Sequence, residues 1–482
     1  FAGANYSHVD GTETWNNENY QFTQSLFDRE SYSKNSYQNH QEYMQFRYQN
    51  QKGKRYWVGK FTLVNLSTPR NASSGFAKES TETDVFSNIR KKSLSPKIDL
   101  NANLPLSKNQ TLTLGVHGKY SANSYHRLYQ EQPFETMTDE DEKALSFQLS
   151  AIYNYFSQKH SLSVELFHYH DVWNADYSGN CELWQHLWKG ESLAFFSYNF
   201  QASRRLSLKT RIGLDWLQYH LHGDNSFSQL SPRINTNVQY QLNKGMLLWS
   251  FNFVNSNHGM DVINRAMIQV NSHMMEKGMP ELKKSHDINT YLYYMGRFNR
   301  LSVSAIGQFR YNHHPVTDDY YLDEANGKIV KTYSNGGNAQ YYSAILALQY
   351  KLCKFANLSG DIRYNHAEVK TTWSKHNNNL TGNLGLNMFM GDFALKPYLH
   401  FGKKSLDEAA LVISKTPIDY GMSCSYSRGN LYVELQAASP FKKQEKQYWL
   451  DLPIYSYSKS IKDQTASQYA SIKVAYSFDF GR

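Results

Sequence analysis

Apolar and polar side chains alternate along most of the chain, and this period of two is typical of β-strands whose two faces have different surroundings. Between Leu206 and Trp216, for example, one face carries mainly Leu, Ile and Trp side chains, and the other carries Ser, Lys, Arg and Asp. Charges at this spacing exclude a dry core on the second face. The segment also has about the length that a tilted strand needs to cross a bilayer. A membrane barrel with a wet interior is therefore predicted, and a soluble sandwich array is the architectural alternative.

The connections between the predicted strands alternate between very short and very long. Short turns are expected near residues 51–54, 106–109, 157–160, 202–205, 243–245, 296–299, 351–354, 391–392 and 427–430. Long polar segments are expected between them, including residues 121–142, 172–190, 255–284, 313–338 and 439–466. Tight periplasmic turns and long extracellular loops are typical of bacterial outer-membrane barrels, and a sandwich gives no reason for this asymmetry.

Aromatic side chains of the apolar face gather at both ends of the predicted strands. They are Tyr155, Tyr240, Tyr294 and Tyr350 just before short turns, and Tyr120, Trp216, Tyr311 and Tyr364 at the far ends. Such girdles mark the two interfaces of a membrane barrel. The last strand follows the same scheme, since Ile472, Val474, Tyr476, Phe478 and Phe480 share one face. We therefore expect an all-β, transmembrane, antiparallel up-and-down β-barrel, with about 20 strands in this chain.

Composition argues against a helical membrane protein and against a nucleic-acid-binding protein. The chain is 15% aromatic with a mean hydropathy of −0.66, and no stretch reaches the roughly 18 apolar residues of a membrane-spanning helix. The net charge of +9 comes from Lys and Arg residues scattered among nearly as many acids, so nucleic-acid binding is not expected. A charged lumen and charged loop rims account for the excess equally well. Cys181, Cys353 and Cys424 are too far apart for a disulfide framework and lack metal-site spacing.

Three tryptophans in the polar segment 172–190 are candidate ligand contacts. Trp173, Trp184 and Trp188 could stack on sugar rings, because an exposed indole offers a flat apolar surface. The favoured alternative is that they pack this segment over the barrel mouth or fold it into a further short hairpin. Two histidine pairs, His168 with His170 and His220 with His222, have a metal-ligand spacing on one strand face. Their interpretation as rim residues at the strand-to-loop boundary is preferred.

Catalytic motifs are missing from the sequence. It contains no Gly-x-Ser-x-Gly elbow, no His-Glu-x-x-His pair and no phosphate-binding glycine loop. Charged pairs on the predicted inner face, such as Asp361 with Arg363, are interpreted as charge-balanced pore walls. We therefore predict that the protein is not an enzyme, and we assign no catalytic residue, cofactor or metal.

Three segments carry a family resemblance. Ser231-Pro232-Arg233-Ile234 opens one strand, residues 278–283 (Gly-Met-Pro-Glu-Leu-Lys) precede the next, and residues 476–482 (Tyr-Ser-Phe-Asp-Phe-Gly-Arg) end the chain. On these residues the chain resembles the outer-membrane β-barrel family of TonB-dependent-receptor-like proteins, over essentially its whole length. The family usually shows Gly-Asn-Pro-Asn-Leu-Lys-Pro at the second segment, where Met279, Glu281 and Lys284 depart from the pattern. The aromatic-rich end resembles the signal that the barrel-assembly machinery reads.

The resemblance implies parts of the protein that precede the barrel. Family members carry a signal peptide and a plug domain, and the plug fills the lumen and contacts TonB. Nothing in residues 1–482 looks like a plug or a signal peptide. The first predicted strand runs outward and the last runs inward, so any missing strands are even in number. We therefore expect residues 1–482 to be an outer-membrane β-barrel fragment of a 22-stranded barrel, without its signal peptide, plug and first hairpin.

The function that the resemblance implies is import of a nutrient across the outer membrane of a Gram-negative bacterium. The expected partners are outer-membrane lipid and, through the absent plug, TonB. The cargo stays open among oligosaccharides, metal chelates and peptides, with sugars slightly favoured by the loop aromatics. The alternative is a non-transporting structural or partner-binding barrel in a multi-protein outer-membrane assembly, with a surface lipoprotein as a partner. A second alternative is a passive porin, against which the family's usual plug argues.

Overall fold

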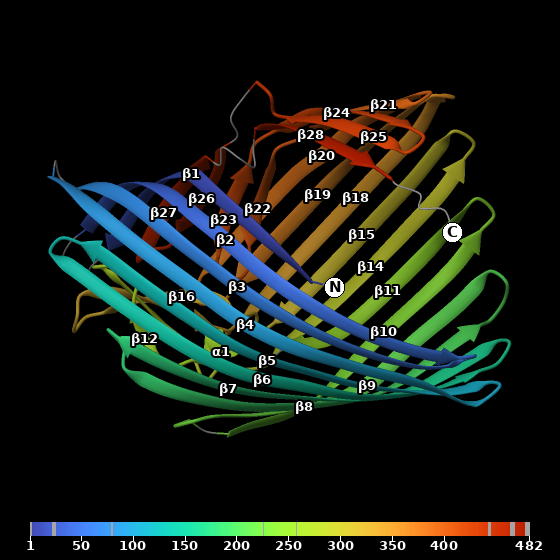
Figure 1. The fold of residues 1–482 in the computed structure, drawn as a ribbon, viewed down its shortest axis with the longest axis horizontal. Coiled ribbons are helices and arrows are strands. Elements are labelled where there is room, and N and C mark those ends of the chain that lie inside the picture. Colours follow the sequence, from blue (N-terminus) through green and yellow to red (C-terminus); the bar gives the residue numbers. More distant parts are fainter. Residues whose placement is uncertain are drawn as a thin grey trace.

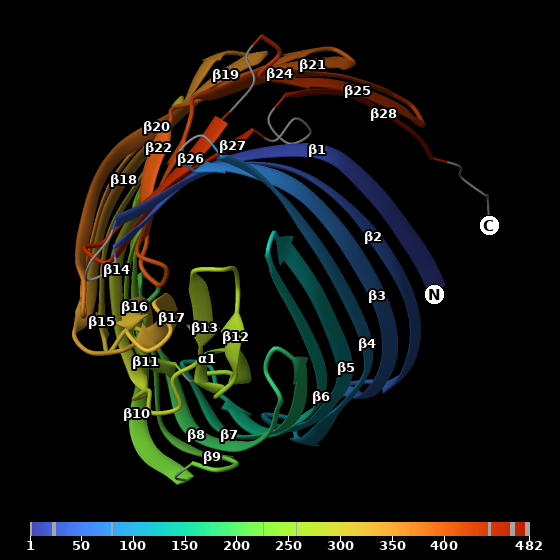
Figure 2. The ribbon, with the colours of Figure 1, turned by 90° about the vertical axis from the view of Figure 1, so that its left-hand side faces the viewer.

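The computed structural model describes residues 2–21, 26–78, 81–224, 226–256, 258–441, 445–462 and 468–477. Nearly all of them lie in β-strands, and one antiparallel sheet curves into a barrel (Figures 1 and 2). The predicted fold class is confirmed, because twenty strands of the described chain follow one another up and down around this barrel.

The barrel strands are longest in the first half of the chain. This half contains β1 (Ala2–Gln21), β2 (Leu26–Lys52), β3 (Arg55–Lys78), β4 (Thr81–Ser107), β5 (Gln110–Glu131), β6 (Phe134–Phe156), β7 (His160–Gly179), β8 (Leu183–Gln201), β9 (Leu206–Leu221) and β10 (Ser226–Leu242). The second half contains β11 (Gly245–Ser256), β14 (Ser285–Phe298), β15 (Leu301–His313), β18 (Asn338–Cys353), β19 (Ala356–Lys370), β20 (Ser374–Met390), β21 (Phe393–His400), β24 (Asp419–Arg428), β25 (Leu431–Ala438) and β28 (Tyr469–Tyr476). Strands of up to 27 residues are far longer than a bilayer requires, so the first half of the wall extends well beyond the lipid.

The short turns lie where the sequence predicts them, with boundaries that shift by a few residues at most. The largest changes are the turns at 299–300 and 354–355, which were expected at 296–299 and 351–354. These turns gather at the right-hand end of Figure 1. The strict alternation of the connections therefore separates two ends of the barrel.

The predicted long segments are folded rather than irregular. Residues 121–142 and 172–190 continue the strands of two hairpins, which turn only at 132–133 and 180–182. Residues 172–190 thus form the end of the hairpin of β7 and β8 and not a separate short hairpin. Residues 439–466 contain the paired strands β26 (Glu445–Asp451) and β27 (Tyr455–Lys462), and a further hairpin is formed by β22 (Lys403–Asp407) and β23 (Val412–Thr416).

The two remaining long segments fold into the barrel. They contain the helix α1 (Met260–Ile263) and the strands β12 (Met267–Gln269), β13 (Met274–Lys277), β16 (Thr317–Asp323) and β17 (Lys328–Ser334). The four strands form a separate sheet in the order β12-β13-β17-β16, with β13 and β17 parallel. Figure 2 shows this inner sheet and α1 within the ring of barrel strands. We call residues 258–284 and 314–337 together the cap.

Apolar side chains cover the outside of the barrel wall. On β9, Ile212, Leu214 and Trp216 are 49%, 52% and 48% exposed, whereas the neighbouring Asp215 is completely buried inside. On β28, Ile472, Val474 and Tyr476 are also exposed, and Phe478 and Phe480 lie outside the described residues. This orientation, with apolar side chains outward and charged ones inward, is the arrangement of a lipid-facing barrel.

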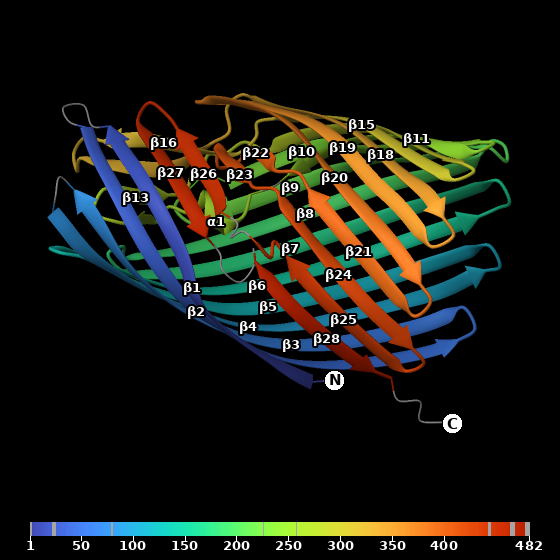
Figure 3. The ribbon, with the colours of Figure 1, turned by 90° about the horizontal axis from the view of Figure 1, so that it is seen from above.

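The barrel has a seam between its first and last strands. Glu13–Tyr20 of β1 pair with β27, which closes the sheet on the side of the long connections. Below this level β28 pairs with β25, and within the described residues no pairing joins β28 to the first part of β1. Figure 3 shows β1 and β28 on either side of this seam.

A substitution pair on β18 tests the assignment of the two faces. Leu346 lies midway between the exposed Tyr342 and Tyr350 on the outer face, and Ala347 lines a luminal cavity. We expect Leu346→Arg to lower the free energy of unfolding by about 2–4 kcal/mol, because it places a charge at the centre of the bilayer. Ala347→Arg should change it by less than about 1 kcal/mol, because the arginine reaches water. Urea unfolding in lipid vesicles measures both values, and equal losses would contradict the assignment.

Candidate functional site in the barrel lumen

The cap is attached to the barrel wall through two hydrophobic clusters. In the first, Met260 and Ile263 of α1 contact Leu187 of β8 and Leu221 of β9, all of which are buried. In the second, residues of β13, β16 and β17 pack against the ends of the C-terminal strands and hairpins. Its buried members are Met274, Tyr320, Ile329, Ala339, Val369, Leu411, Val412, Leu450, Leu452 and Tyr455. The two clusters attach the cap to two different parts of the barrel wall.

Hydrogen bonds connect the cap to a third part of the wall, at β5. Arg127 Nη2 donates to the Val270 carbonyl oxygen at 2.7 Å, and Ser272 Oγ donates to Glu131 Oε1 at 2.8 Å. The cap therefore contacts β5, β8–β9 and the C-terminal hairpins at the same time. The cap thus occupies part of the lumen on the side of the long connections.

A buried charge cluster holds the segment in which the cap returns to the wall. Lys284 Nζ lies 2.8 Å from Asp215 Oδ2, and both side chains are completely buried. Arg233 Nη2 lies 2.7 Å from the same oxygen and 3.0 Å from Glu191 Oε1. Two of the segments that carry the family resemblance thus meet here, one through Arg233 and the other through Lys284, which follows it directly. The departure from the family pattern at Lys284 supplies a buried cation.

The inner sheet contains a second charge cluster. Lys331 Nζ lies 3.3 Å from both Asp318 Oδ2 and Glu276 Oε1. Burial alone would lower the pKa of Lys331, but the two carboxylates raise it to about 12. Burial raises the pKa of Asp318 above its ordinary value, against the effect of Lys331. Both carboxylates are paired with the one lysine within the cap, so the three groups are interpreted as structural.

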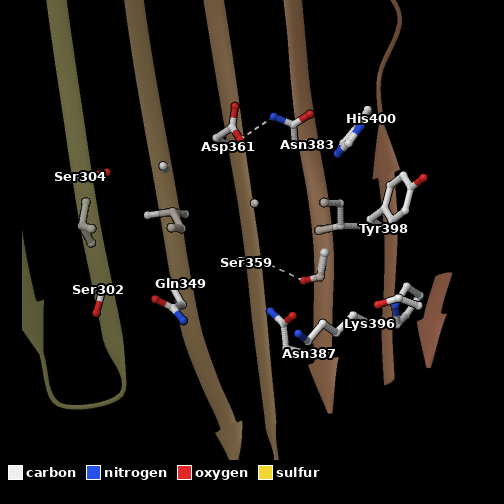
Figure 4. A pocket seen from close by; sticks show the side chains of 18 of the residues that line it. Ser302, Ser304, Gln349, Ser359, Asp361, Asn383, Asn387, Lys396, Tyr398 and His400 are labelled. Atoms are coloured by element: carbon white, nitrogen blue, oxygen red, sulfur yellow. Dashed lines mark hydrogen bonds between the residues drawn. The ribbon is translucent and has the colours of Figure 1, made fainter. Parts of the chain in front are cut away.

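A cavity of about 730 Å³ lies on the inner wall of β14, β15, β18–β21, β24 and β25. Figure 4 shows its polar lining, which includes Ser302, Ser304, Gln349, Ser359, Asp361, Asn383, Asn387, Lys396, Tyr398 and His400. Asn383 Nδ2 donates to Asp361 Oδ1 at 2.8 Å, and Arg363 Nη2 lies 3.9 Å from Asp361 Oδ2, as expected for a charge-balanced pore wall. Hydroxyl and amide groups predominate, so this wall can hydrogen-bond a polar solute. The cavity is not predictable from the sequence, because each strand contributes only a few alternate polar residues to it.

The three predicted tryptophans do not form one surface. Trp173 faces the lumen, where it packs against the cluster around α1 and lies 5.8 Å from Lys189 Nζ. Trp184 and Trp188 are on the opposite, outer face of the wall. There Trp184 stacks on His186 at 5.9 Å, and Trp188 meets the edge of His170 at 5.5 Å. Contact of these residues with a ligand stays a prediction, and only the outer pair could share one.

Metal coordination has no support in the described part of the chain. No group of three or more His, Cys, Asp or Glu side chains there is placed to hold an ion, and all three cysteines are free. His168 and His170 lie on the outer face, where both contact the ring of Phe147. None of the described helices is long and apolar enough to cross a membrane.

Comparison with known proteins identifies the fold. No protein-family model matches the chain, and no curated protein is similar to it in sequence. Solved structures do match it. The match with the copper transporter OprC (TM-score 0.58, 10% identity) covers 94% of this chain and 80% of the OprC chain. Two further matches each cover 94% of this chain and 81% of the other chain. They are the FrpB iron transporter from Neisseria meningitidis (TM-score 0.52, 8% identity) and the ferric-catecholate import receptor Fiu from K12 E. coli (TM-score 0.53, 10% identity). The fold is that of a TonB-dependent-receptor-like outer-membrane barrel. At such low identity the likeness concerns the fold alone.

The buried cluster predicts an order of effects for two substitutions. Asp215→Leu removes the carboxylate that Lys284 and Arg233 share, so we expect a loss of about 3–5 kcal/mol in the free energy of unfolding. Lys284→Met should cost less, about 1–3 kcal/mol, because Asp215 keeps Arg233. Urea unfolding and limited proteolysis of the cap measure both effects. Arg211→Gln is the control, since the pair of Arg211 with Glu165 lies elsewhere on the wall. A protease-resistant cap in Asp215→Leu would contradict the role of the cluster.

The cap should also loosen in acid. His258 is half-buried and its Nε2 lies 2.8 Å from the Lys283 carbonyl oxygen. Burial lowers the pKa of His258, and Lys189 acts in the same direction. A lowered pKa means that the folded cap disfavours the proton, so this contribution to stability is complete above about pH 6.5 and is lost as the pH falls. Hydrogen exchange of residues 258–284 should therefore increase between about pH 7.5 and pH 5.5, after correction for the intrinsic rate. The increase should be smaller in His258→Gln, and an unchanged response there would contradict the assignment.

Proposed function

We propose that this protein is the barrel of a TonB-dependent receptor that imports a nutrient through the outer membrane of a Gram-negative bacterium. The observation that supports it best is a polar lumen that the cap partly occupies on one side. The similar solved structures OprC, FrpB and Fiu are named as a copper transporter, an iron transporter and a ferric-catecholate import receptor. None of these three names describes an enzyme.

The cap argues against the passive porin. A porin conducts through a permanently open, water-filled lumen. Here two buried clusters and the bonds to β5 place a folded sheet inside the barrel. Passage of a solute then needs the cap or a luminal plug to move, which fits an energised importer better than a pore.

Energy coupling in this proposal comes from a plug that contacts TonB and lies outside residues 1–482. We also propose that two further strands fill the seam between β1 and β28. Unpaired backbone groups at the two seam edges would be costly in lipid, so a hairpin there stabilises the barrel. An even number of added strands keeps the up-and-down alternation, and two give the expected 22.

The polar cavity wall fits a hydrophilic cargo. Its Ser, Asn and Gln side chains can donate and accept hydrogen bonds, and Tyr398 adds an aromatic surface. An oligosaccharide satisfies both features, and a metal chelate or a peptide satisfies the first. The cavity thus agrees with the slight preference for sugars.

The second candidate is a non-transporting barrel that serves a multi-protein outer-membrane assembly, with a surface lipoprotein as its partner. The attachment of the cap at three parts of the wall favours it, because a permanently docked cap would leave no route through the lumen. The two candidates differ in whether the cap moves.

Uptake measurements in cells distinguish these candidates. Cells that produce the full-length protein are given radiolabelled iron chelates, copper and oligosaccharides, in strains with and without TonB. We expect uptake of at least one probe to depend on both the protein and TonB. A strain lacking only this protein is the matched control. If no probe enters in a TonB-dependent manner while neighbouring outer-membrane proteins co-purify with the barrel, the import proposal is wrong and the structural role is supported.

A further inference from the structure

Four basic side chains form a patch on the wall of β2–β5, strands that lie side by side in Figure 2. They are Arg47 of β2, Lys60 of β3, Lys97 of β4 and Lys119 of β5. We call them the cationic wall. Arg47, Lys97 and Lys119 are exposed, and Lys60 is half-buried.

The cationic wall faces the lumen. Strand registers place all four residues on the same face as Asp99 and His117. Along β4 this face alternates with Ile98 and Leu100, whose exposed apolar side chains belong to the outer surface. The four cations therefore lie behind the lipid-facing part of the wall, inside the barrel.

The four cations are placed so that they repel one another, which lowers the stability of the folded sheet. Arg47 lies directly opposite Lys60, and Lys97 lies directly opposite Lys119. Side chains in such positions have Cβ atoms about 4.5–5.5 Å apart, where like charges destabilise a sheet. The wall keeps two such pairs next to each other.

The carboxylate next to the cationic wall, Asp99, is bonded to another group and forms no ion pair with the four cations. Asp99 is directly opposite Lys60, but its Oδ1 lies 2.8 Å from His117 Nδ1. Within the described residues, none of the four cations has an acidic group within salt-bridge distance. Glu140 and Glu142, on the same face of β6, are hydrogen-bonded by Tyr177 and Asn123.

Apart from Asp99 and His117, the side chains next to the cationic wall on the luminal face are neutral and polar. They include Gln45, Thr62, Ser95, Asn101 and Ser121. They can donate hydrogen bonds but supply no counter-charge. An anion in the lumen would supply it.

We propose that the cationic wall binds a polyanionic cargo, a solute with several carboxylate or sulfate groups, during its passage through the lumen. The inference rests on the proposed import function and adds the charge class of the cargo. Neighbouring strands are about 4.8 Å apart, so the four cations extend over about 14 Å. A solute with one anionic group cannot reach all of them. Figure 2 shows the strands of the polar cavity across the lumen, so a bound solute would meet cations on one side and hydroxyl and amide groups on the other.

Calorimetric titration of the protein, extracted from outer membranes in detergent, tests the charge class. The probes are an oligogalacturonate, which carries carboxylates, a heparin-derived oligosaccharide, which carries sulfates, and a neutral malto-oligosaccharide of equal length. We expect at least one polyanion to bind at least about tenfold more tightly than the neutral sugar, and less tightly as salt is added. The carboxylate and sulfate probes separate the two chemical sources. Equal affinity for the neutral sugar, or no polyanion binding below millimolar concentration, would overturn the inference.

A pair of double substitutions locates the binding. Lys97→Gln/Lys119→Gln should weaken polyanion binding at least about tenfold and raise the urea midpoint, because the repulsion between the two lysines disappears. Arg90→Gln/Lys92→Gln removes the same charge from the outer face of β4 and should change the affinity by less than about twofold. Equal weakening by both double variants means a general charge effect and overturns the inference.

Failure of this inference can be told apart from failure of the proposed function. If uptake depends on TonB but Lys97→Gln/Lys119→Gln binds polyanions as tightly as the unchanged protein, only the role of the cationic wall is rejected. Polyanion binding at the wall without any TonB-dependent uptake rejects import and leaves a binding barrel.

Discussion

The structure depends on the need to pair every backbone N–H and C=O group that lies in lipid. A sheet meets this need only by closing on itself, because an open edge leaves a row of unpaired groups. The antiparallel pairing continues from β1 to β25 and β28, and β27 joins β1 on the side of the long connections. The alternation of apolar and polar side chains follows from this closure, since each strand then has one face to lipid and one to water.

Closure also gathers the polar side chains of all strands in one compartment, where their charges must be compensated. Arg233 and Lys284 share Asp215, and Arg211 lies 2.6 Å from Glu165. Charges are thus paired where the cap meets the wall and also at other places on the luminal face, such as Arg211 with Glu165. The cationic wall differs from these pairs, because its charges face the lumen and none of them forms an ion pair with an acid in the part of the chain that the structure describes. This contrast separates groups that hold the structure together from groups that are free to bind.

Periodicity predicts the membrane part of the barrel well and the parts beyond it poorly. Leu206–Trp216 alternates strictly because one face meets lipid. Residues 121–142 were expected as a polar loop, yet they are strand, because beyond the lipid both faces are polar, as His126 and Asp139 on the outer face show. The cap could not be predicted, because β13 pairs with β17 from a segment more than fifty residues away, as in Met274 with Ile329. The departure at Lys284 looked like a weakened motif, although it provides a buried ion pair that only the fold reveals.

The shared oxygen of Asp215 has a consequence for how the molecule assembles. Asp215 is on β9 and Arg233 on the adjacent β10, so the site that receives Lys284 exists only after these two strands have paired. Lys284 lies 69 residues after Asp215 and arrives with the return of the cap. Without Lys284, Arg233 alone neutralises this carboxylate. The final position of Lys284 therefore depends on the pairing of β9 with β10, so the return of the cap to the wall is conditional on a contact between two strands that the cap itself does not contain.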